Sequence, residues 1–198
     1  MIIKYVDVAP DYLLADAINE INSIDWKAID DGRTKRTPAF ASSTSIQIRI
    51  HKQPEQMHSN VHEWGKIVET TDHPVHIKKF PKVILLADWI KNRVGGVKLG
   101  RVMLVNLSSG GVVIPHIDKG EYFDVHSRFH IPIKTNSKVN FGSSLNENLS
   151  HMQEHCLYQL NNTALHYVEN LGDEDRIHLI VDVELPSRNT PENFTVSF

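Results

Sequence analysis

Cysteine is almost absent from this chain, as are long apolar segments and a strong excess of charge. The single cysteine, Cys156, excludes an internal disulfide and fits a reducing compartment. No apolar run is long enough to span a bilayer, and residues 1–7 carry an early acidic side chain with no signal-peptide core, so we expect a cytoplasmic protein. The net charge of -3 gives no electrostatic reason to expect a nucleic-acid or membrane-surface partner.

The composition that is present is typical of a globular protein. Of the 198 residues, 40% are hydrophobic and 23% are charged, which is sufficient for one domain with a substantial core. We therefore expect a single domain over residues 1–198. It comprises strand and helix support at 1–97, a β-barrel core at 98–185 and a tail at 186–198.

The N-terminal half combines strand patterns with helical ones. Asp11 is the expected N-cap of a first helix, and Pro81 is expected to open a second helix that ends at Gly95-Gly96. We expect these helices to pack on the outside of a sheet. The expected segments are strands at 2–8 and 43–50 and helices at 11–22, 55–69 and 81–94.

From Lys98 onward the pattern changes to short strands separated by turn residues. This pattern is typical of a double-stranded β-helix, also called a jelly roll or cupin-like barrel. The predicted fold is therefore mainly β with flanking helices and an N-terminal helical layer. The expected strands are 98–107, 112–118, 128–134, 138–142, 155–160, 164–168 and 176–185.

A His-x-Asp pair within one predicted strand is the first candidate for a metal site. His116 and Asp118 are two residues apart, so a strand directs both side chains to the same face. His166 lies in a second short apolar run, and two imidazoles with one carboxylate form the facial ligand set of non-haem Fe(II) oxygenases. The spacing alone is a weak signal, because His-x-Asp also occurs by chance and a strand histidine often has only a structural role.

Two further strands place cationic side chains beside this site. Arg176 opens an apolar strand, and a buried guanidinium requires an anion, for which the distal carboxylate of 2-oxoglutarate is suited. Arg128 and His130 share a face of another strand and extend the same cradle. For Arg176 the alternatives are pairing with one of the acidic residues at 173–175 and simple exposure at a strand end. For 127–133 the alternative is a half-exposed antiparallel strand with ordinary alternation.

These motifs together carry a family resemblance over about residues 100–185. The segments VIPHID, SRFHIPI and ALHYVENLGDEDRIHLIVDV resemble the aspartyl/asparaginyl β-hydroxylase family of Fe(II)/2-oxoglutarate dioxygenases, which includes free-proline hydroxylases. Asp118 departs from the animal peptidyl enzymes, which lack this carboxylate, and looks like the bacterial members. The resemblance implies a dioxygenase domain with Fe(II), 2-oxoglutarate and dioxygen. It implies iron ligands at His116, Asp118 and His166, and 2-oxoglutarate contacts at Arg176, Arg128 and His130.

Three interpretations of the function follow. The first is a hydroxylase acting on an unactivated C–H bond of an amino acid, or of an Asp, Asn or Pro side chain in a protein. The second is a cupin-like metalloenzyme without 2-oxoglutarate, and the third is a non-catalytic jelly-roll binding module. A zinc hydrolase is a weaker possibility, since no glutamate base is positioned beside the triad. Specificity is expected in the loops around 33–43, 119–127 and 143–152.

Overall fold

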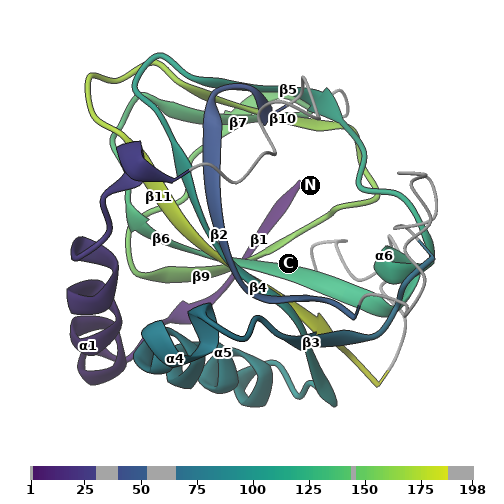
Figure 1. Ribbon diagram of the computed structural model, residues 1–198. Helices are drawn as coiled ribbons and strands as arrows, with labels where there is room; N and C mark the ends of the chain where they lie inside the picture. Colours follow the sequence, from purple (N-terminus) through teal and green to yellow (C-terminus); the bar gives the residue numbers. More distant parts are fainter. Residues whose placement is uncertain (1, 30–39, 53–65, 144–145, 187–198) are drawn as a thin grey trace.

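The computed structural model describes residues 2–29, 40–52, 66–143 and 146–186 (Figure 1). The predicted tail from residue 187 and most of the 33–43 loop lie outside these residues. Residues 55–65 of the predicted helix at 55–69 also lie outside the described residues. Residues 66–69 are described and are not helical.

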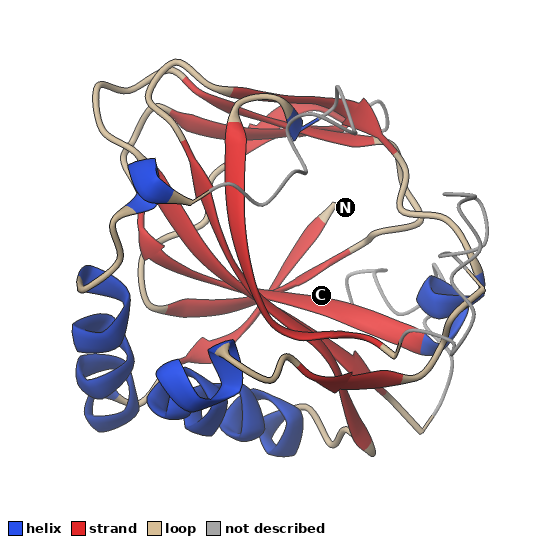
Figure 2. Ribbon diagram, viewed as in Figure 1, coloured by secondary structure: helices blue, strands red, loops and turns tan. Residues whose placement is uncertain are grey.

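Two antiparallel sheets face each other and form the barrel (Figures 1 and 2). The large sheet has the order β1-β9-β6-β11-β4-β2-β3, and the small sheet has the order β5-β10-β7-β8. The strands are β1 Ile3–Val8, β2 Ser43–His51, β3 Thr70–Asp72, β4 Lys98–Leu107, β5 Val112–His116, β6 His126–Lys134, β7 Val139–Ser143, β8 Asn146–Ser150, β9 Cys156–Leu160, β10 His166–Asn170 and β11 Arg176–Glu184. The helices are α1 Asp11–Asn22, η1 Trp26–Ala28, α4 His76–Lys79, α5 Pro81–Arg93 and α6 Glu121–Val125. The predicted jelly-roll fold is confirmed.

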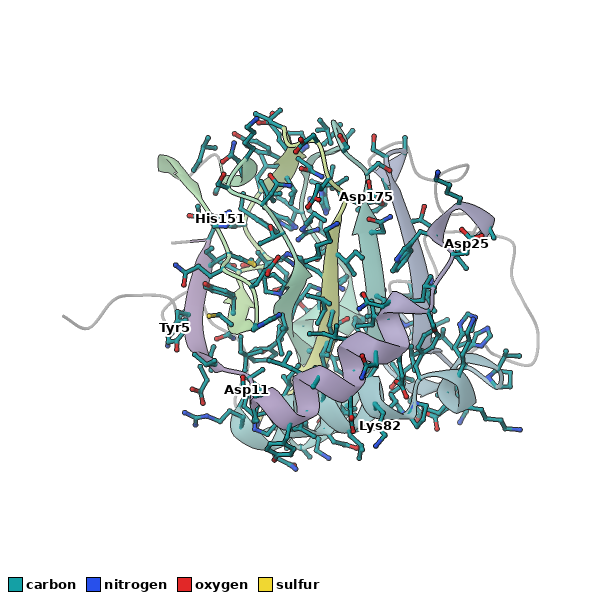
Figure 3. The ribbon with its side chains drawn as sticks, turned by 90° about the vertical axis from the view of Figure 1, so that its left-hand side faces the viewer. Tyr5, Asp11, Asp25, Lys82, His151 and Asp175 are labelled. Atoms are coloured by element: carbon teal, nitrogen blue, oxygen red, sulfur yellow. The ribbon has the colours of Figure 1, made fainter. Side chains whose placement is uncertain are left out.

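The outer face of the large sheet is apolar, and α1 and α5 cover it (Figures 1 and 2). In β11, the four alternate residues Ile177, Leu179, Val181 and Val183 enter this core. Because side chains alternate along a strand, the residues between them must point into the barrel. The two helices are tied together where the Glu20 carboxylate accepts the backbone N–H groups at the start of α5. Figure 3 shows Lys82, near the start of α5, beside α1. Asp175, which directly precedes β11, lies toward the opposite end of the molecule in this view.

The inner face of the same sheet carries most of the buried charge. Arg176, His178 and Asp182 alternate along β11, and Arg128 and His130 alternate along the neighbouring β6. All five side chains are buried. Charged groups are rarely buried unless they are paired or bind a ligand, so this face is the place to look for function.

Most predicted elements match the structure, with differences at their ends. The first helix is capped by Pro10, whose carbonyl accepts the N–H groups of Leu13 and Leu14, so Asp11 is not the N-cap but lies in the first turn. β5 ends at His116, which leaves Asp118 beyond the strand. The N-terminal region contributes β1, β2 and β3 to the large sheet itself. None of the helices in the described ranges is long and apolar enough to cross a membrane.

Candidate metal centre

Three predicted ligand residues meet between the two sheets. His116 ends β5, His166 begins β10, and the two residues are paired in the register of these strands. Asp118 is brought to them because its backbone N–H donates to the carbonyl of Asn162, which precedes β10. One possible ligand atom from each of the three residues lies within 4.8 Å of the others. This group could hold a metal ion.

Hydrogen bonds already set the two imidazoles for metal binding. Nδ1 of His116 lies 2.9 Å from the carbonyl oxygen of Ile114, and Nδ1 of His166 lies 2.9 Å from that of Ala164. A carbonyl can only accept, so each Nδ1 carries the hydrogen and each Nε2 keeps a free lone pair. Burial lowers the pKa of His166, which favours the neutral ring that a metal requires. Two neutral imidazoles and one carboxylate fit Fe(II).

Asp118 is held from behind by Arg128. The Nη1 atom of Arg128 donates to Asp118 at 2.6 Å, while its Nε and Nη2 atoms donate to Asp182 at 2.8 and 3.0 Å. Burial alone would raise the pKa of Asp182, but Arg128 and Arg101 outweigh burial and hold that pKa well below its usual range. Arg128 is therefore a buried cation whose charge is matched by two carboxylates.

Arg176 lies in a different environment. Its side chain is almost fully buried, and no carboxylate within the described part of the chain forms an ion pair with it. Its Nη2 donates to Nδ1 of His178 at 2.7 Å, its guanidinium lies over the Phe141 ring, and its Nε has no partner among the described residues. Burial lowers the pKa of Arg176 to about 9, so the group is still charged at neutral pH.

The acidic residues next to Arg176 do not neutralise it. Asp175 accepts hydrogen bonds from the Asn106 side chain and the Ser109 backbone, and Glu174 pairs with Lys134 at 3.4 Å. The structural alternative, in which Arg176 pairs with one of residues 173–175, is thus not found within the described residues. Within the described residues this guanidinium therefore has no anionic partner, and an anionic ligand would satisfy it.

Two histidines complete the surroundings of Arg176. His130 and His178 lie with their Nδ1 atoms 3.3 Å apart, and the Nε2 atom of each is buried without a partner among the described residues. Burial, with Arg176 close by, keeps the pKa of each well below its ordinary value, so both rings are neutral. Because Nδ1 of His178 accepts from Arg176, its hydrogen sits on Nε2, which is a free donor. His178 is absent from the predicted site, although its position two residues after Arg176 could have indicated it.

Comparison with known families finds one that covers most of the chain. The model of the family described as Aspartyl/Asparaginyl beta-hydroxylase matches residues 25–186. A search of curated proteins found no match.

Solved structures with the same fold are distant in sequence. The prolyl hydroxylase from Trichoplax adhaerens, solved with a hypoxia inducible factor peptide fragment, has 9% identity and a TM-score of 0.57, covering 92% of this chain and 82% of its own. The viral collagen prolyl hydroxylase from Paramecium Bursaria Chlorella virus-1, solved with 2OG, has 10% identity and a TM-score of 0.55, with coverages of 93% and 97%. A 2OG-Fe(II) oxygenase family oxidoreductase from Burkholderia pseudomallei has 10% identity and a TM-score of 0.51, with coverages of 86% and 89%. At these identities the likeness shows a shared fold.

Proposed function

The chain belongs to the aspartyl/asparaginyl β-hydroxylase family, and we propose that His116, Asp118 and His166 are the residues that bind its iron. It is an Fe(II)- and 2-oxoglutarate-dependent dioxygenase, a hydroxylase. This membership decides against a cupin-like enzyme without 2-oxoglutarate and against a non-catalytic module. When bound, iron and 2-oxoglutarate supply the oxidising power that places an oxygen atom from dioxygen into a C–H bond.

Arg176 is proposed as the residue that fixes the distal carboxylate of 2-oxoglutarate. The observation that carries this assignment is a guanidinium almost fully buried without a carboxylate partner in the described chain. A carboxylate can accept two parallel hydrogen bonds from such a fork. His178, with a free Nε2–H, is a second donor at the same place, and His130 stays a proposed contact.

Arg128 is proposed to position the metal site rather than to carry the charge of the co-substrate. The earlier expectation of a direct 2-oxoglutarate contact stays a prediction, but the charge of Arg128 is already matched by Asp118 and Asp182. By donating to one oxygen of Asp118, Arg128 leaves the other oxygen for the metal. Outer hydrogen bonds of this kind orient metal ligands.

The proposed substrate is an amino acid, or an Asp, Asn or Pro side chain in a peptide or protein. Two of the similar structures are prolyl hydroxylases, and one of them holds a peptide fragment. Their likeness concerns the fold, so the choice among these substrates has to come from the side chains of this chain.

The ligand assignment is tested by removing one ligand at a time. We expect Asp118→Ala and His166→Ala to abolish iron-dependent consumption of 2-oxoglutarate while the protein stays folded, because the metal is expected to occupy a preformed barrel. Anaerobic equilibrium dialysis measures bound Fe(II), and circular dichroism checks the fold. The control is His73→Ala, since His73 stacks on His76 on the α4 side of the sheet. Unchanged iron binding and turnover in the ligand variants would remove the triad from this role.

A further inference from the structure

A third arginine lies in the same row of the inner face as Arg128. Arg101 on β4 donates from Nε to Asp182 at 3.2 Å, and Asp182 pairs with Arg128 across the β6–β11 register. Arg101, Asp182 and Arg128 therefore follow one another across three adjacent strands. The last of them contacts the proposed metal ligand Asp118, so three successive ion pairs connect Arg101 to that ligand.

Two aromatic rings of α6 fix the Arg101 side chain. Its guanidinium carbon lies 4.5 Å from the ring centre of Tyr122 and 5.2 Å from that of Phe123, while the Arg128 guanidinium lies 4.9 Å from the Phe123 ring. The Tyr122 hydroxyl accepts the Arg101 backbone N–H at 2.8 Å and donates to Asp182 at 3.2 Å. The Arg101 guanidinium is therefore held in one orientation.

Asp182 accepts a hydrogen bond from only one guanidinium nitrogen of Arg101. Arg128 gives Asp182 two short hydrogen bonds and Tyr122 gives a third, whereas Arg101 adds one longer bond from Nε. The Nη2 atom of Arg101 is buried and has no partner among the described residues. A purely structural counter-ion would explain the Nε contact but leaves this second donor without an acceptor.

The charges around the site leave room for one more anion. Among the described residues, the inner face around the site carries three guanidiniums, those of Arg101, Arg128 and Arg176, and two carboxylates, those of Asp118 and Asp182, which, of these guanidiniums, pair with Arg101 and Arg128 only. The neighbouring histidines add no charge: burial lowers the pKa of His51 to about 4 and also lowers the pKa of His126. Iron(II) and the dianion of 2-oxoglutarate cancel each other, so the loaded site keeps one excess positive charge. A charge that is so little exposed to water favours an anionic partner.

We propose that the substrate carries a carboxylate and that Arg101 binds it. This inference rests on the proposed function, since it needs iron and 2-oxoglutarate in the places given above. The Arg101 side chain is 16% exposed, so part of it can be reached by a substrate, whereas Arg176 is almost fully buried. Arg101 then selects a free amino acid or an Asp side chain over an Asn side chain or a proline inside a peptide.

The test compares acids with their amides. The protein is loaded with Zn(II), which replaces iron without turnover, and saturated with 2-oxoglutarate. The probes are the free L-amino acids, N-acetyl-aspartate amide and, for each, the matching carboxamide, with dissociation constants measured by ligand-observed NMR. We expect at least one acid to bind about tenfold to a hundredfold more tightly than its amide, because a charge-assisted hydrogen bond is lost in the amide.

Variants at Arg101 assign this preference to one residue. Arg101→Gln is expected to bind the preferred acid and its amide equally, and Arg101→Lys to keep part of the preference because it keeps the charge without the fork. Arg49→Gln is the matched control, since Arg49 is a neighbouring arginine whose donors already bond to Asp72, Thr70 and the carbonyl of Gly100. It should retain the full preference.

Two results overturn the inference. One is a wild-type protein in which no acid of the panel binds better than its amide, and the other is an Arg101→Gln variant that keeps the preference. The charge-transfer band of the Fe(II)-loaded protein with 2-oxoglutarate is recorded on the same preparations. If that band forms but no preference is found, only the Arg101 inference fails; if the band is absent, the proposed function fails.

Discussion

Arg128 and Arg176 lie on the same inner face of the large sheet, are both buried, and differ in what they pair with. Arg128 touches two carboxylates, and these raise its pKa although burial alone would lower it. Arg176 touches no carboxylate of the described chain, and burial lowers its pKa to about 9. The two arginines therefore illustrate two roles of a buried cation. Arg128 holds carboxylates of the protein in place, and Arg176 is proposed to bind the carboxylate of a ligand.

The largest expected effect is a loss of stability on removing Arg128, the arginine that pairs with two carboxylates. Arg128→Met leaves Asp182 fully buried with only Arg101 and Tyr122 as donors, so we expect the free energy of unfolding to fall by roughly 3–5 kcal/mol. Urea denaturation of the metal-free protein measures it. The control is Arg93→Met, because Arg93 forms an exposed ion pair with Asp7, whose loss should cost less than about 1 kcal/mol. Equal losses in both variants would show that the Arg128 network does not stabilise the fold.

Removing Arg176, which has no carboxylate partner in the described chain, should affect 2-oxoglutarate binding and not the stability of the fold. Arg176→Met deletes a buried charge that has no carboxylate partner in the described chain, so we expect the unfolding free energy of the unliganded protein to stay constant or rise. Binding of 2-oxoglutarate should weaken by roughly 2–5 kcal/mol, because the charged partner of its distal carboxylate is lost. Urea denaturation with and without 2-oxoglutarate, on the Zn(II)-loaded protein, measures both quantities. A loss of stability as large as that of Arg128→Met, with unchanged 2-oxoglutarate affinity, contradicts this assignment.

A smaller effect is expected at His178, which shares the surroundings of Arg176. His178→Phe keeps the ring volume but removes the free Nε2–H, so 2-oxoglutarate affinity should fall by about 1–2 kcal/mol. Isothermal titration calorimetry on the Zn(II)-loaded variant measures the change, with His73→Phe as the control outside the barrel. If both variants bind 2-oxoglutarate as the wild type does, His178 is a structural residue only.

The strand pattern alone predicts much of this arrangement. Alternation along β11 puts Arg176 and His178 on the face opposite to Ile177 and Leu179, and the same rule pairs Arg128 with His130 on β6. These faces are local properties of the sequence. The outline of the barrel and its helical layer follows for the same reason, since both rest on periodicity and turn residues.

The partners of these residues could not be predicted in the same way. Asp182 meets Arg128 across 54 positions of sequence and Arg101 across 81, contacts that depend on strand order rather than on local pattern. The five-residue helix α6 is too short to show a helical period, yet it supplies Tyr122 and Phe123. Asp118 lies beyond the end of β5, so its place beside His166 depends on the bond from its N–H to the carbonyl of Asn162, and not on strand geometry.

The most direct test of the site is an anaerobic titration of the Fe(II)-loaded protein with 2-oxoglutarate, followed by its visible metal-to-ligand charge-transfer band. We expect the band to form in the wild type and to be absent in His116→Ala. In Arg176→Met it should form only at much higher 2-oxoglutarate concentration, with iron binding unchanged. Iron binding without a band in the wild type, or an unshifted titration in Arg176→Met, would contradict the proposed division between the two arginines.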